Sequence, residues 1–310
     1  MKVFVAGSSG LVGSATAEKY EQLGHQVIRG SKKLLNLLDR AAVFNFIRDQ
    51  QPDLIIDSAA KVGGIGANAN NPTQFLSENL QIQCNLMDAA LKYRIKKFVF
   101  LGSSCIYPRN CTQPIKEEYL LSGPLEDTNS AYAIAKIAGI EAVKAVRNQY
   151  GLEWISLMPT NVYGPRDNFD IDNSHVLPAL IRKFIIAKED GSSEVRLWGD
   201  GTPLREFIYS EDLADAIMIA EQKYNEVSHL NIGSGEEISI KILAQKIANE
   251  IGYENDIVWD PTKPNGTPRK KLDSSKMNLL GWTPKWNLES GIARTIKWFK
   301  TNLTNGDVRI

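Results

Sequence analysis

Short apolar runs of strand length alternate with longer amphipathic stretches through the first half of the chain. Strands and helices that alternate in this way predict βαβ units, whose strands form a parallel sheet with helices on its faces. We therefore expect an α/β fold. The predicted strands span residues 3–6, 27–28, 54–56, 98–101 and 154–158.

The alternation breaks after residue 165, where a loop rich in Pro, Asn and Asp spans 167–173. Short strands, helices and turn clusters are mixed beyond it. We expect a Rossmann-like doubly wound parallel sheet as a first domain over 1–163, and a smaller α/β domain mainly over 164–310. A further strand-then-helix pattern at 205–222 predicts that this segment returns to the first domain.

Two helical stretches, 80–93 and 131–149, carry apolar residues on more than one face. One face would pack on the sheet and another on a second subunit, so we expect a homodimer. The polar tail at 301–310 is expected to be frayed.

Composition narrows the range of partners. The 310 residues include 36 basic and 36 acidic side chains, so the net charge of zero offers no field to attract nucleic acid or an acidic membrane. Three cysteines and three scattered histidines show no metal-ligand spacing, which favours a reducing cytoplasm and no structural metal. The chain begins directly in a strand, and no apolar run approaches ~18 residues, so neither secretion nor a membrane span is expected.

A glycine-rich loop, Gly7-Ser-Ser-Gly10-Leu-Val-Gly13, follows the first predicted strand and opens a helix over 14–23. Its G-x-x-G-x-x-G spacing in this context is typical of dinucleotide binding. Gly7 would permit the tight turn, Gly10 the approach of a pyrophosphate, and Gly13 the packing of helix on strand. The alternative is an ordinary strand-to-helix turn.

The second predicted strand indicates which dinucleotide is bound. NAD enzymes usually carry an acidic residue near its end for the ribose 2′-hydroxyl, but here the sequence runs Val27-Ile-Arg29-Gly-Ser-Lys32-Lys33. A 2′-phosphate would be favoured there, so we expect NADP. The alternative is a solvated basic turn. Asp39 lies farther along and would reach the adenine end of the cofactor.

Tyr132 and Lys136 have i, i+4 spacing, which places both side chains on one face of a helix. A Lys ammonium there, with the positive charge of an oxidised nicotinamide nearby, would lower the pKa of the tyrosine and make it a workable proton donor. The strand at 98–101 leads into Ser103 and Ser104, where a hydroxyl would bind a substrate carbonyl oxygen.

Together the loop, the strand-end serine and the YxxxK spacing resemble the extended short-chain dehydrogenase/reductase superfamily. Within it, longer motifs over nearly the whole chain resemble the GDP-L-fucose synthase family. These motifs are KVGGI at 61–65, LGSSCIYP at 101–108, YAIAKIAG at 132–139, MPTNVYGP at 158–165, DNF at 167–169, NSHVLP at 173–178, GTPLREF at 201–207 and GTPRK at 266–270.

This resemblance implies a two-stage reaction on GDP-4-keto-6-deoxy-D-mannose. The ketone acidifies the hydrogens at C3 and C5, so Cys105 as base and His175 as acid would invert both centres through an enolate. Tyr132 would then protonate the oxygen while NADPH reduces C4, with Lys136 supporting Tyr132 and Ser103 holding the oxygen. The alternatives are a small buried hydrophobe for Cys105 and a helix cap for His175.

The resemblance also implies binding residues, with NADP on the first domain and the GDP-sugar on the second. For the substrate they are Lys183, Trp198, Arg205, Asn265 and Lys270, and for the cofactor Gly7, Ser8, Ser9, Gly10, Leu11, Val12, Gly13, Arg29, Asn36, Leu101, Gly102, Ser103, Ser104, Lys136, Pro159, Thr160, Asn161, Val162 and His175. Two positions depart from the family pattern. Ser9 replaces a frequent basic residue near the 2′-phosphate, and Asn265 replaces a common aspartate near the nucleotide.

Two other functions compete with this one. The first is another nucleotide-sugar enzyme, a 4-epimerase or a 4,6-dehydratase, which recycles its hydride; Cys105 and His175 argue against it. The second is a non-catalytic NADP(H) sensor. Such proteins typically lose the tyrosine or the lysine, and both Tyr132 and Lys136 are present here.

Overall fold

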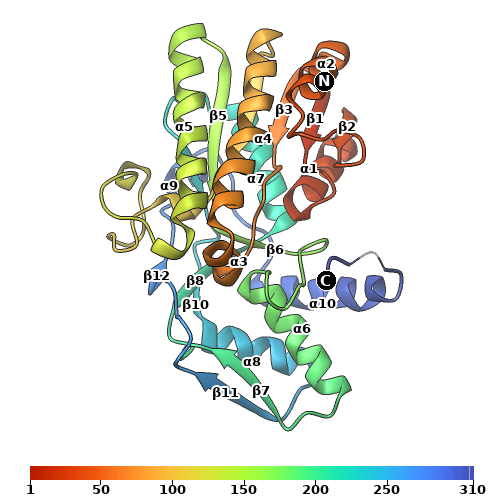
Figure 1. Ribbon diagram of the computed structural model, residues 1–310, viewed down its shortest axis with the longest axis vertical. Helices are drawn as coiled ribbons and strands as arrows, with labels where there is room; N and C mark the ends of the chain where they lie inside the picture. Colours follow the sequence, from red (N-terminus) through yellow and green to blue (C-terminus); the bar gives the residue numbers. More distant parts are fainter. Residues whose placement is uncertain (307) are drawn as a thin grey trace.

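The computed structural model describes residues 1–306 and 308–310 and has a six-stranded parallel sheet at its centre (Figure 1). The strand order is β2-β1-β3-β4-β5-β9. All five predicted strands are present, and the sixth, β9, was not predicted for this sheet. The strands are β1 (Lys2–Ala6), β2 (Gln26–Gly30), β3 (Leu54–Asp57), β4 (Lys97–Leu101), β5 (Glu153–Pro159) and β9 (Leu230–Ile232).

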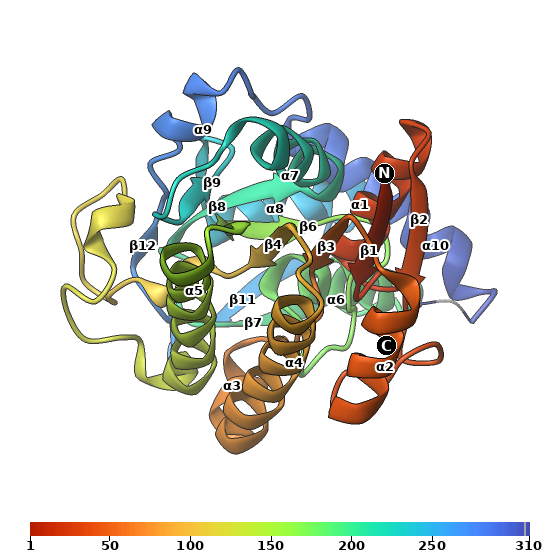
Figure 2. The same ribbon diagram turned by 90° about the horizontal axis from the view of Figure 1, so that it is seen from above.

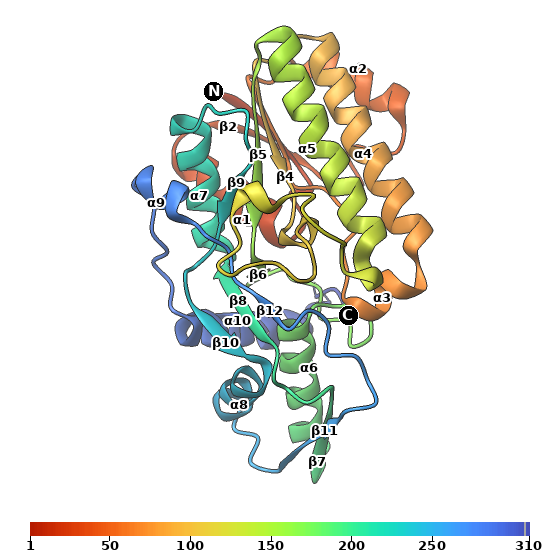
Figure 3. The same cartoon turned by 90° about the vertical axis from the view of Figure 1, so that its left-hand side faces the viewer.

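Helices cover both faces of this sheet, so its strands are apolar on both sides. Val3 and Val5 of β1 pack toward one face with Tyr20 and Leu213, whereas Phe4 packs toward the other. Figures 2 and 3 show α1 and α7 on one side and α2, α4 and α5 on the other. The expected doubly wound α/β fold is confirmed. These helices are α1 (Leu11–Gln22), α2 (Arg40–Gln50), α4 (Pro72–Lys92), α5 (Ser130–Tyr150) and α7 (Ser210–Lys223).

Local chemistry sets where these helices start and stop. Asp39 is the N-cap of α2, and its side chain accepts a hydrogen bond from the Ala42 N–H at 3.0 Å. One oxygen of its carboxylate is therefore used at the helix start, and the expected adenine contact stays a prediction. Pro72 opens α4, where its missing N–H costs nothing. Gly151, with φ of +67°, ends α5 in the left-handed conformation.

A second region lies below the main sheet in Figure 1 and has its own apolar core, which includes Phe169, Phe184 and Leu243. Its strand β8 pairs with β6, β10 and β12, and β7 pairs with β11. Its elements are β6 (Asn161–Tyr163), α6 (Val176–Glu189), β7 (Glu194–Trp198), β8 (Leu204–Tyr209), β10 (Glu237–Ser239), α8 (Ile240–Ile251), β11 (Asp256–Asp260), β12 (Arg269–Lys270) and α10 (Leu288–Leu303); α3 (Ile65–Asn70) and α9 (Ser275–Leu279) are short helices elsewhere.

The segment 205–222 divides between the two regions. Its helix, α7, packs in the core of the main sheet, where Leu213 and Ile217 lie beside Val3 and Ile56. Its strand, β8, lies in the second sheet. The chain then enters the main sheet once more as β9, so several crossings connect the regions.

The end of the chain contacts the loop that follows β6. The Phe169 N–H donates to the Arg309 carbonyl at 2.8 Å, and Asn168 and Arg309 form a β-bridge. The tail that we expected to be frayed thus gives a partner to a loop N–H. Among the residues that the structure describes, no helix is both long and apolar enough to cross a membrane.

Candidate active site

The main sheet reverses its winding direction between β1 and β3, and the glycine loop lies at this switch point. Gly7 has a φ of +78°, and a Cβ there would lie 2.9 Å from the backbone of Ala59 after β3. A Cβ on Gly13 would lie 2.3 Å from the Gly7 carbonyl oxygen. Both glycines are therefore required by packing within the chain. Ligands of open α/β sheets bind at such a point.

Gly10 differs, because a Cβ there would meet only the Gly7 carbonyl oxygen, at 3.4 Å. The chain itself does not need a glycine here, and the open side leaves room for a close ligand. Gly10 is also the N-cap of α1 and provides no side-chain hydrogen bond to the helix start. The N–H groups at this helix terminus suit an anion, so the loop fits a dinucleotide pyrophosphate.

Arg29 has a partner that the sequence did not reveal. Its guanidinium forms two hydrogen bonds to the Glu21 carboxylate of α1, at 2.8 and 2.7 Å, and both side chains are about 40% exposed (38% and 41%). A 2′-phosphate would have to compete with Glu21 for this cation. Asn36, also predicted to contact the cofactor, accepts a hydrogen bond from the Leu38 N–H at 3.2 Å.

Tyr132 and Lys136 lie on α5 where it covers the carboxyl end of β4. The Lys136 ammonium donates to the Leu101 carbonyl at 2.8 Å and lies 5.9 Å from the centre of the Tyr132 ring. Burial lowers the pKa of Lys136 to about 8, and Asp57 opposes this shift. Burial also raises the pKa of Tyr132, with Cys105 acting in the same direction. The expected lowering of the tyrosine pKa is absent in the chain alone, because burial dominates.

Asp57, the last residue of β3, was missed by the sequence analysis. It is 1% exposed, and burial raises the pKa of its carboxyl to about 6. One oxygen accepts from the Ala59 N–H at 3.2 Å, and the other is buried without a partner. Asp57 pairs in register with Phe100, whose ring lies 4.8 Å from the Lys136 ammonium. The sequence did contain a signal that could have identified Asp57: an acidic residue directly after the apolar residues of the third predicted strand.

Cys105 lies in a 3₁₀ turn, η1 (Ser104–Ile106), directly after β4. Ser103 caps this turn by accepting the Cys105 N–H at 3.2 Å, which leaves the Ser103 hydroxyl proton available to donate. Cys105 packs beside Phe75 and Tyr132. Its sulfur lies 3.5 Å from the Asn129 side-chain nitrogen and 3.6 Å from the Lys270 ammonium.

His175 occupies the N-cap position of α6, but its side chain makes no capping hydrogen bond. His175 is exposed, and yet protein surrounds its ring closely enough to disfavour the charged form. This surrounding and the charge of Lys270 lower the pKa of His175. Lys270 thus contacts Cys105, which packs beside Tyr132, and its charge acts on His175.

The predicted substrate residues lie in the second region. Trp198 is 47% exposed, with the Lys263 ammonium 5.7 Å from its ring. The Asn265 side chain accepts the Asp200 N–H at 3.0 Å and so braces the turn after Trp198. The Arg205 guanidinium donates to the Leu204 carbonyl at 2.8 Å.

Three further candidates are Lys183, for which the structure shows a shifted pKa, and Thr160 and Asn161, whose side chains bond to a backbone carbonyl. Partial burial lowers the pKa of Lys183, and Asp172 opposes this shift. The Thr160 and Asn161 side chains both donate to the Glu206 carbonyl, at 3.1 and 2.8 Å. These two side chains therefore hold β5 and β6 against β8, and any contact with the cofactor would come from their other atoms.

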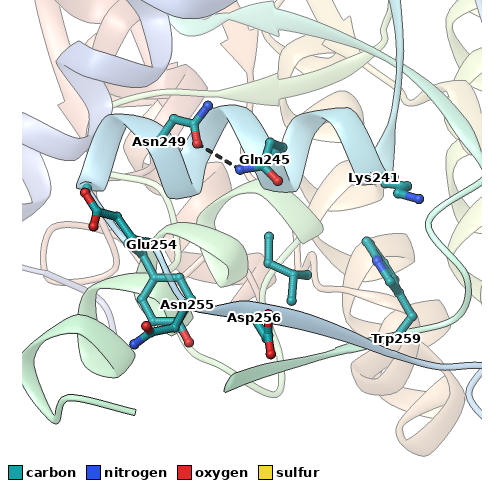
Figure 4. A pocket seen from close by; sticks show the side chains of 10 residues that line it. Lys241, Gln245, Asn249, Glu254, Asn255, Asp256 and Trp259 are labelled. Atoms are coloured by element: carbon teal, nitrogen blue, oxygen red, sulfur yellow. Dashed lines mark hydrogen bonds between the residues drawn. The ribbon is translucent and has the colours of Figure 1, made fainter. Parts of the chain in front are cut away.

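A hollow lies elsewhere, between α8 and β11 (Figure 4). It has a volume of about 620 Å³ and is lined by polar side chains such as Lys241, Gln245 and Asn249 together with Trp259. None of the predicted site residues lines it. We therefore assign the candidate active site from the converging side chains at the ends of β1, β3 and β4.

Comparisons with known proteins agree with this fold. A sequence model of the NAD dependent epimerase/dehydratase family matches residues 3–233. The chain is 50% identical over 304 residues to probable GDP-L-fucose synthase 1 of Oryza sativa subsp. japonica, covering 97% of this chain and 93% of that protein.

Two solved structures are similar over almost the whole chain. One is a GDP-6-OMe-4-keto-L-xylo-heptose reductase from C. jejuni, with a TM-score of 0.92, 33% identity and coverage of 97% of this chain and 98% of that one. The other is a GDP-L-fucose synthetase from Naegleria fowleri bound to NADP, with a TM-score of 0.90, 28% identity and coverage of 100% and 96%. The chain belongs to the NAD dependent epimerase/dehydratase family and is a homologue of the GDP-L-fucose synthases within it.

Proposed function

We propose that this chain converts GDP-4-keto-6-deoxy-D-mannose to GDP-L-fucose, first by epimerisation at C3 and C5 and then by reduction at C4 with NADPH. One observation carries the proposal: Cys105 packs against Tyr132 while its sulfur lies 3.6 Å from Lys270, whose charge also acts on His175. These contacts support placing candidate groups for both stages in one site. The 50% identity to a probable GDP-L-fucose synthase supports the same substrate.

NADP is the proposed cofactor, and when bound it supplies the hydride for C4. The open side of Gly10 and the uncapped start of α1 suit its pyrophosphate. Binding of NADP by the related structure from Naegleria fowleri supports this assignment. Arg29 would meet the 2′-phosphate after leaving Glu21, with Ser9 and Asn36 nearby in the predicted contact set.

In the epimerisation stage, Cys105 removes the proton from the carbon next to the ketone, and His175 delivers a proton to its opposite face. The electron pair of the broken C–H bond moves to the ketone oxygen, giving an enolate. Ser103 holds that oxygen, because its hydroxyl proton is free to donate. Lys183, Trp198, Arg205 and Asn265 hold the GDP portion, so that the sugar stays in place through both inversions.

In the reduction stage, Tyr132 donates its proton to the oxygen at C4. Lys136 supports this donation by its positive charge and is oriented by the Leu101 carbonyl. Because burial, with Cys105 acting in the same direction, raises the pKa of Tyr132, the protonated phenol is the form present before reaction. Tyr132 is thus a general acid at this step.

We also propose the roles of the two domains, the cellular compartment and the oligomeric state of this enzyme. The first domain, residues 1–163, would hold the cofactor, and 164–310 mainly the substrate. The free thiols fit a reducing cytoplasm. A homodimer would use the outer faces of α4 and α5, where Ile134 is 47% exposed.

The test is incubation of GDP-4-keto-6-deoxymannose with the enzyme and NADPH in deuterated water, with NMR of the product. We expect GDP-L-fucose carrying deuterium at C3 and C5, with one NADPH oxidised per product. A product that keeps the starting configuration at C3 and C5 would favour a C4 reductase without epimerase activity. Binding of NADPH without any oxidation would favour a sensor.

A further inference from the structure

We propose that Lys270 and Asn129 hold Cys105 as a thiolate in the resting protein, so that the base is ready before the substrate binds. This inference rests on the proposed function, because it explains how Cys105 would act as the base of the first stage. It adds Asn129 as a positioning residue and gives Lys270 a role beyond contact with the nucleotide.

Two nitrogen donors converge on one sulfur atom. The Asn129 amide nitrogen is 3.5 Å from the Cys105 sulfur, and the Lys270 ammonium is 3.6 Å from it, both within hydrogen-bonding distance for sulfur. A neutral thiol is a weak acceptor, whereas a thiolate accepts strongly from charged and neutral donors. A pair of donors aimed at a single sulfur therefore stabilises the ionised form, as neighbouring cations do in other reactive cysteines.

The position of Asn129 supports this independently. Asn129 is the N-cap residue of α5, a position where an asparagine usually accepts a hydrogen bond from the helix. Here the side chain makes no capping bond, and its oxygen is buried without a partner. Leaving a buried amide oxygen unsatisfied is destabilising. The amide gives up the cap and directs its nitrogen at the sulfur.

The backbone around Lys270 is fixed on both sides. Lys270 pairs with Arg205 of β8 in register. The Lys271 N–H donates to the Gln113 side chain at 2.9 Å, and the Leu272 N–H donates at 3.0 Å to Glu206, which is fully buried. The ammonium is therefore carried by a strand with little freedom to shift.

Other charged groups near the sulfur are mostly cationic. The charge of Arg205 on β8 interacts with Cys105, and the charge of Lys270 also acts on His175 at the start of α6. The carboxylate of Glu126, which acts on Arg205, is paired with Arg109 at 3.1 Å, and this pairing reduces any repulsion of a thiolate. Tyr132, from α5, is neutral in the resting state.

Ionising Cys105 also benefits the acid. Lys270 disfavours a proton on His175, but a thiolate beside Lys270 offsets that charge. An ionised Cys105 therefore favours the protonated form of His175, and a protonated His175 favours the ionised form of Cys105. In the reaction, the C–H bond breaks as S–H forms, and an imidazolium N–H breaks as the new C–H forms. Solvent then restores both groups.

The experiment is a titration of the thiolate by its ultraviolet absorbance, without substrate, in full-length protein carrying Cys84→Ser and Cys111→Ser. We expect a midpoint at least one pH unit below ~8.5, the value of a free thiol. Lys270→Met should raise the midpoint by at least one unit and Asn129→Ala by less, while Lys270→Arg should restore most of the shift. Lys271→Met, which removes the same charge from the next residue, should leave the midpoint unchanged.

A midpoint at or above ~8.5 in the parent protein, or one that Lys270→Met does not move, would overturn the inference. NADPH affinity checks that each variant is folded. Deuterium exchange by the wild-type enzyme separates the two claims: exchange with an unshifted thiol would remove this inference and leave the proposed function standing. A low midpoint in a protein that never exchanges deuterium would do the reverse.

Discussion

The two proposed reaction stages are built from different kinds of structure. Tyr132 and Lys136 lie one turn apart on α5, and Lys136 is fixed by a carbonyl at the end of β4. The groups of the first stage come from short elements: Cys105 from a 3₁₀ turn, Lys270 from a two-residue strand and His175 from the end of a loop. One set depends on a single helix packed on a single sheet, and the other on contacts between distant segments.

This difference predicts that the two stages can be separated by substitution. The reductive groups are 9% exposed or less, and their geometry follows from the main core. The epimerising groups meet only where both regions of the fold come together. Damage to one set should therefore leave the other working.

The largest expected effect is on reduction in Tyr132→Phe. Losing the general acid should reduce NADPH oxidation by about 10³-fold. Deuterium exchange at C3 and C5 should persist, because Cys105 and His175 are untouched. Spectrophotometry of NADPH and NMR of the keto sugar measure the two rates on the same samples. An equal loss of both rates would show that the two stages do not use separate groups.

Next in size is the loss of exchange in Cys105→Ser. A serine hydroxyl ionises far less readily than a thiol, so exchange should fall by about 10²-fold or more. NADPH affinity and the melting temperature should stay close to those of the wild type, since the side chain is partly buried and the change is small. Cys111→Ser is the matched control. Undiminished exchange in Cys105→Ser would remove this residue from the mechanism.

The reductive set was the more predictable from sequence, and for a physical reason. Two of its patterns are local: the i, i+4 spacing of Tyr132 and Lys136 lies within one helix, and the loop from Gly7 to Gly13 joins one strand to the next helix. Neither pattern needs knowledge of distant contacts. Cys105 and His175 were identified only through the resemblance to a family. Nothing in the sequence near Asn129 indicates that its side chain does not cap α5 and instead contacts the sulfur of Cys105.

Tertiary pairing also explains the other differences. Arg29 seemed free in the sequence because its partner, Glu21, lies on the preceding helix and faces it only after β2 packs beside α1. The tail bonds to Phe169 through backbone atoms, which side-chain patterns do not predict. The strand β9 has only three residues and follows a long excursion through the second region, so periodicity could not place it in the main sheet.

A smaller effect should separate the two glycines that the loop uses differently. In Gly13→Ala the new methyl group would overlap the Gly7 carbonyl, so we expect a loss of about 2 kcal/mol in the free energy of unfolding. Gly10→Ala should fold as the wild type does, yet bind NADPH about tenfold, or 1.4 kcal/mol, more weakly. Thermal melts and NADPH titration measure these outcomes. Normal NADPH affinity in Gly10→Ala would mean that its open side does not face the cofactor.

The smallest expected effect concerns Asp57. No sequence motif assigns this residue to either stage, but its charge acts on Lys136 of the reduction stage. Burial holds the pKa of Lys136 at about 8, and the Asp57 carboxylate opposes a further fall. In Asp57→Asn that support is lost, so Lys136 should release its proton at lower pH. The alkaline limb of the reduction rate should therefore move down by about one pH unit, whereas deuterium exchange should keep its profile.

Stability gives a second measurement of the same carboxylate. The pKa of Asp57 is raised to about 6, above its ordinary value, so the folded state binds its proton more tightly than the unfolded state. Its contribution to stability is then present at low pH and is lost as the pH rises through about 6. Asp57→Asn should remove this dependence, and Asp53→Asn, at the exposed start of the same strand, should not. If the alkaline limb of reduction stayed in place while the stability profile changed, Asp57 would belong to the core of the sheet and not to the support of Lys136.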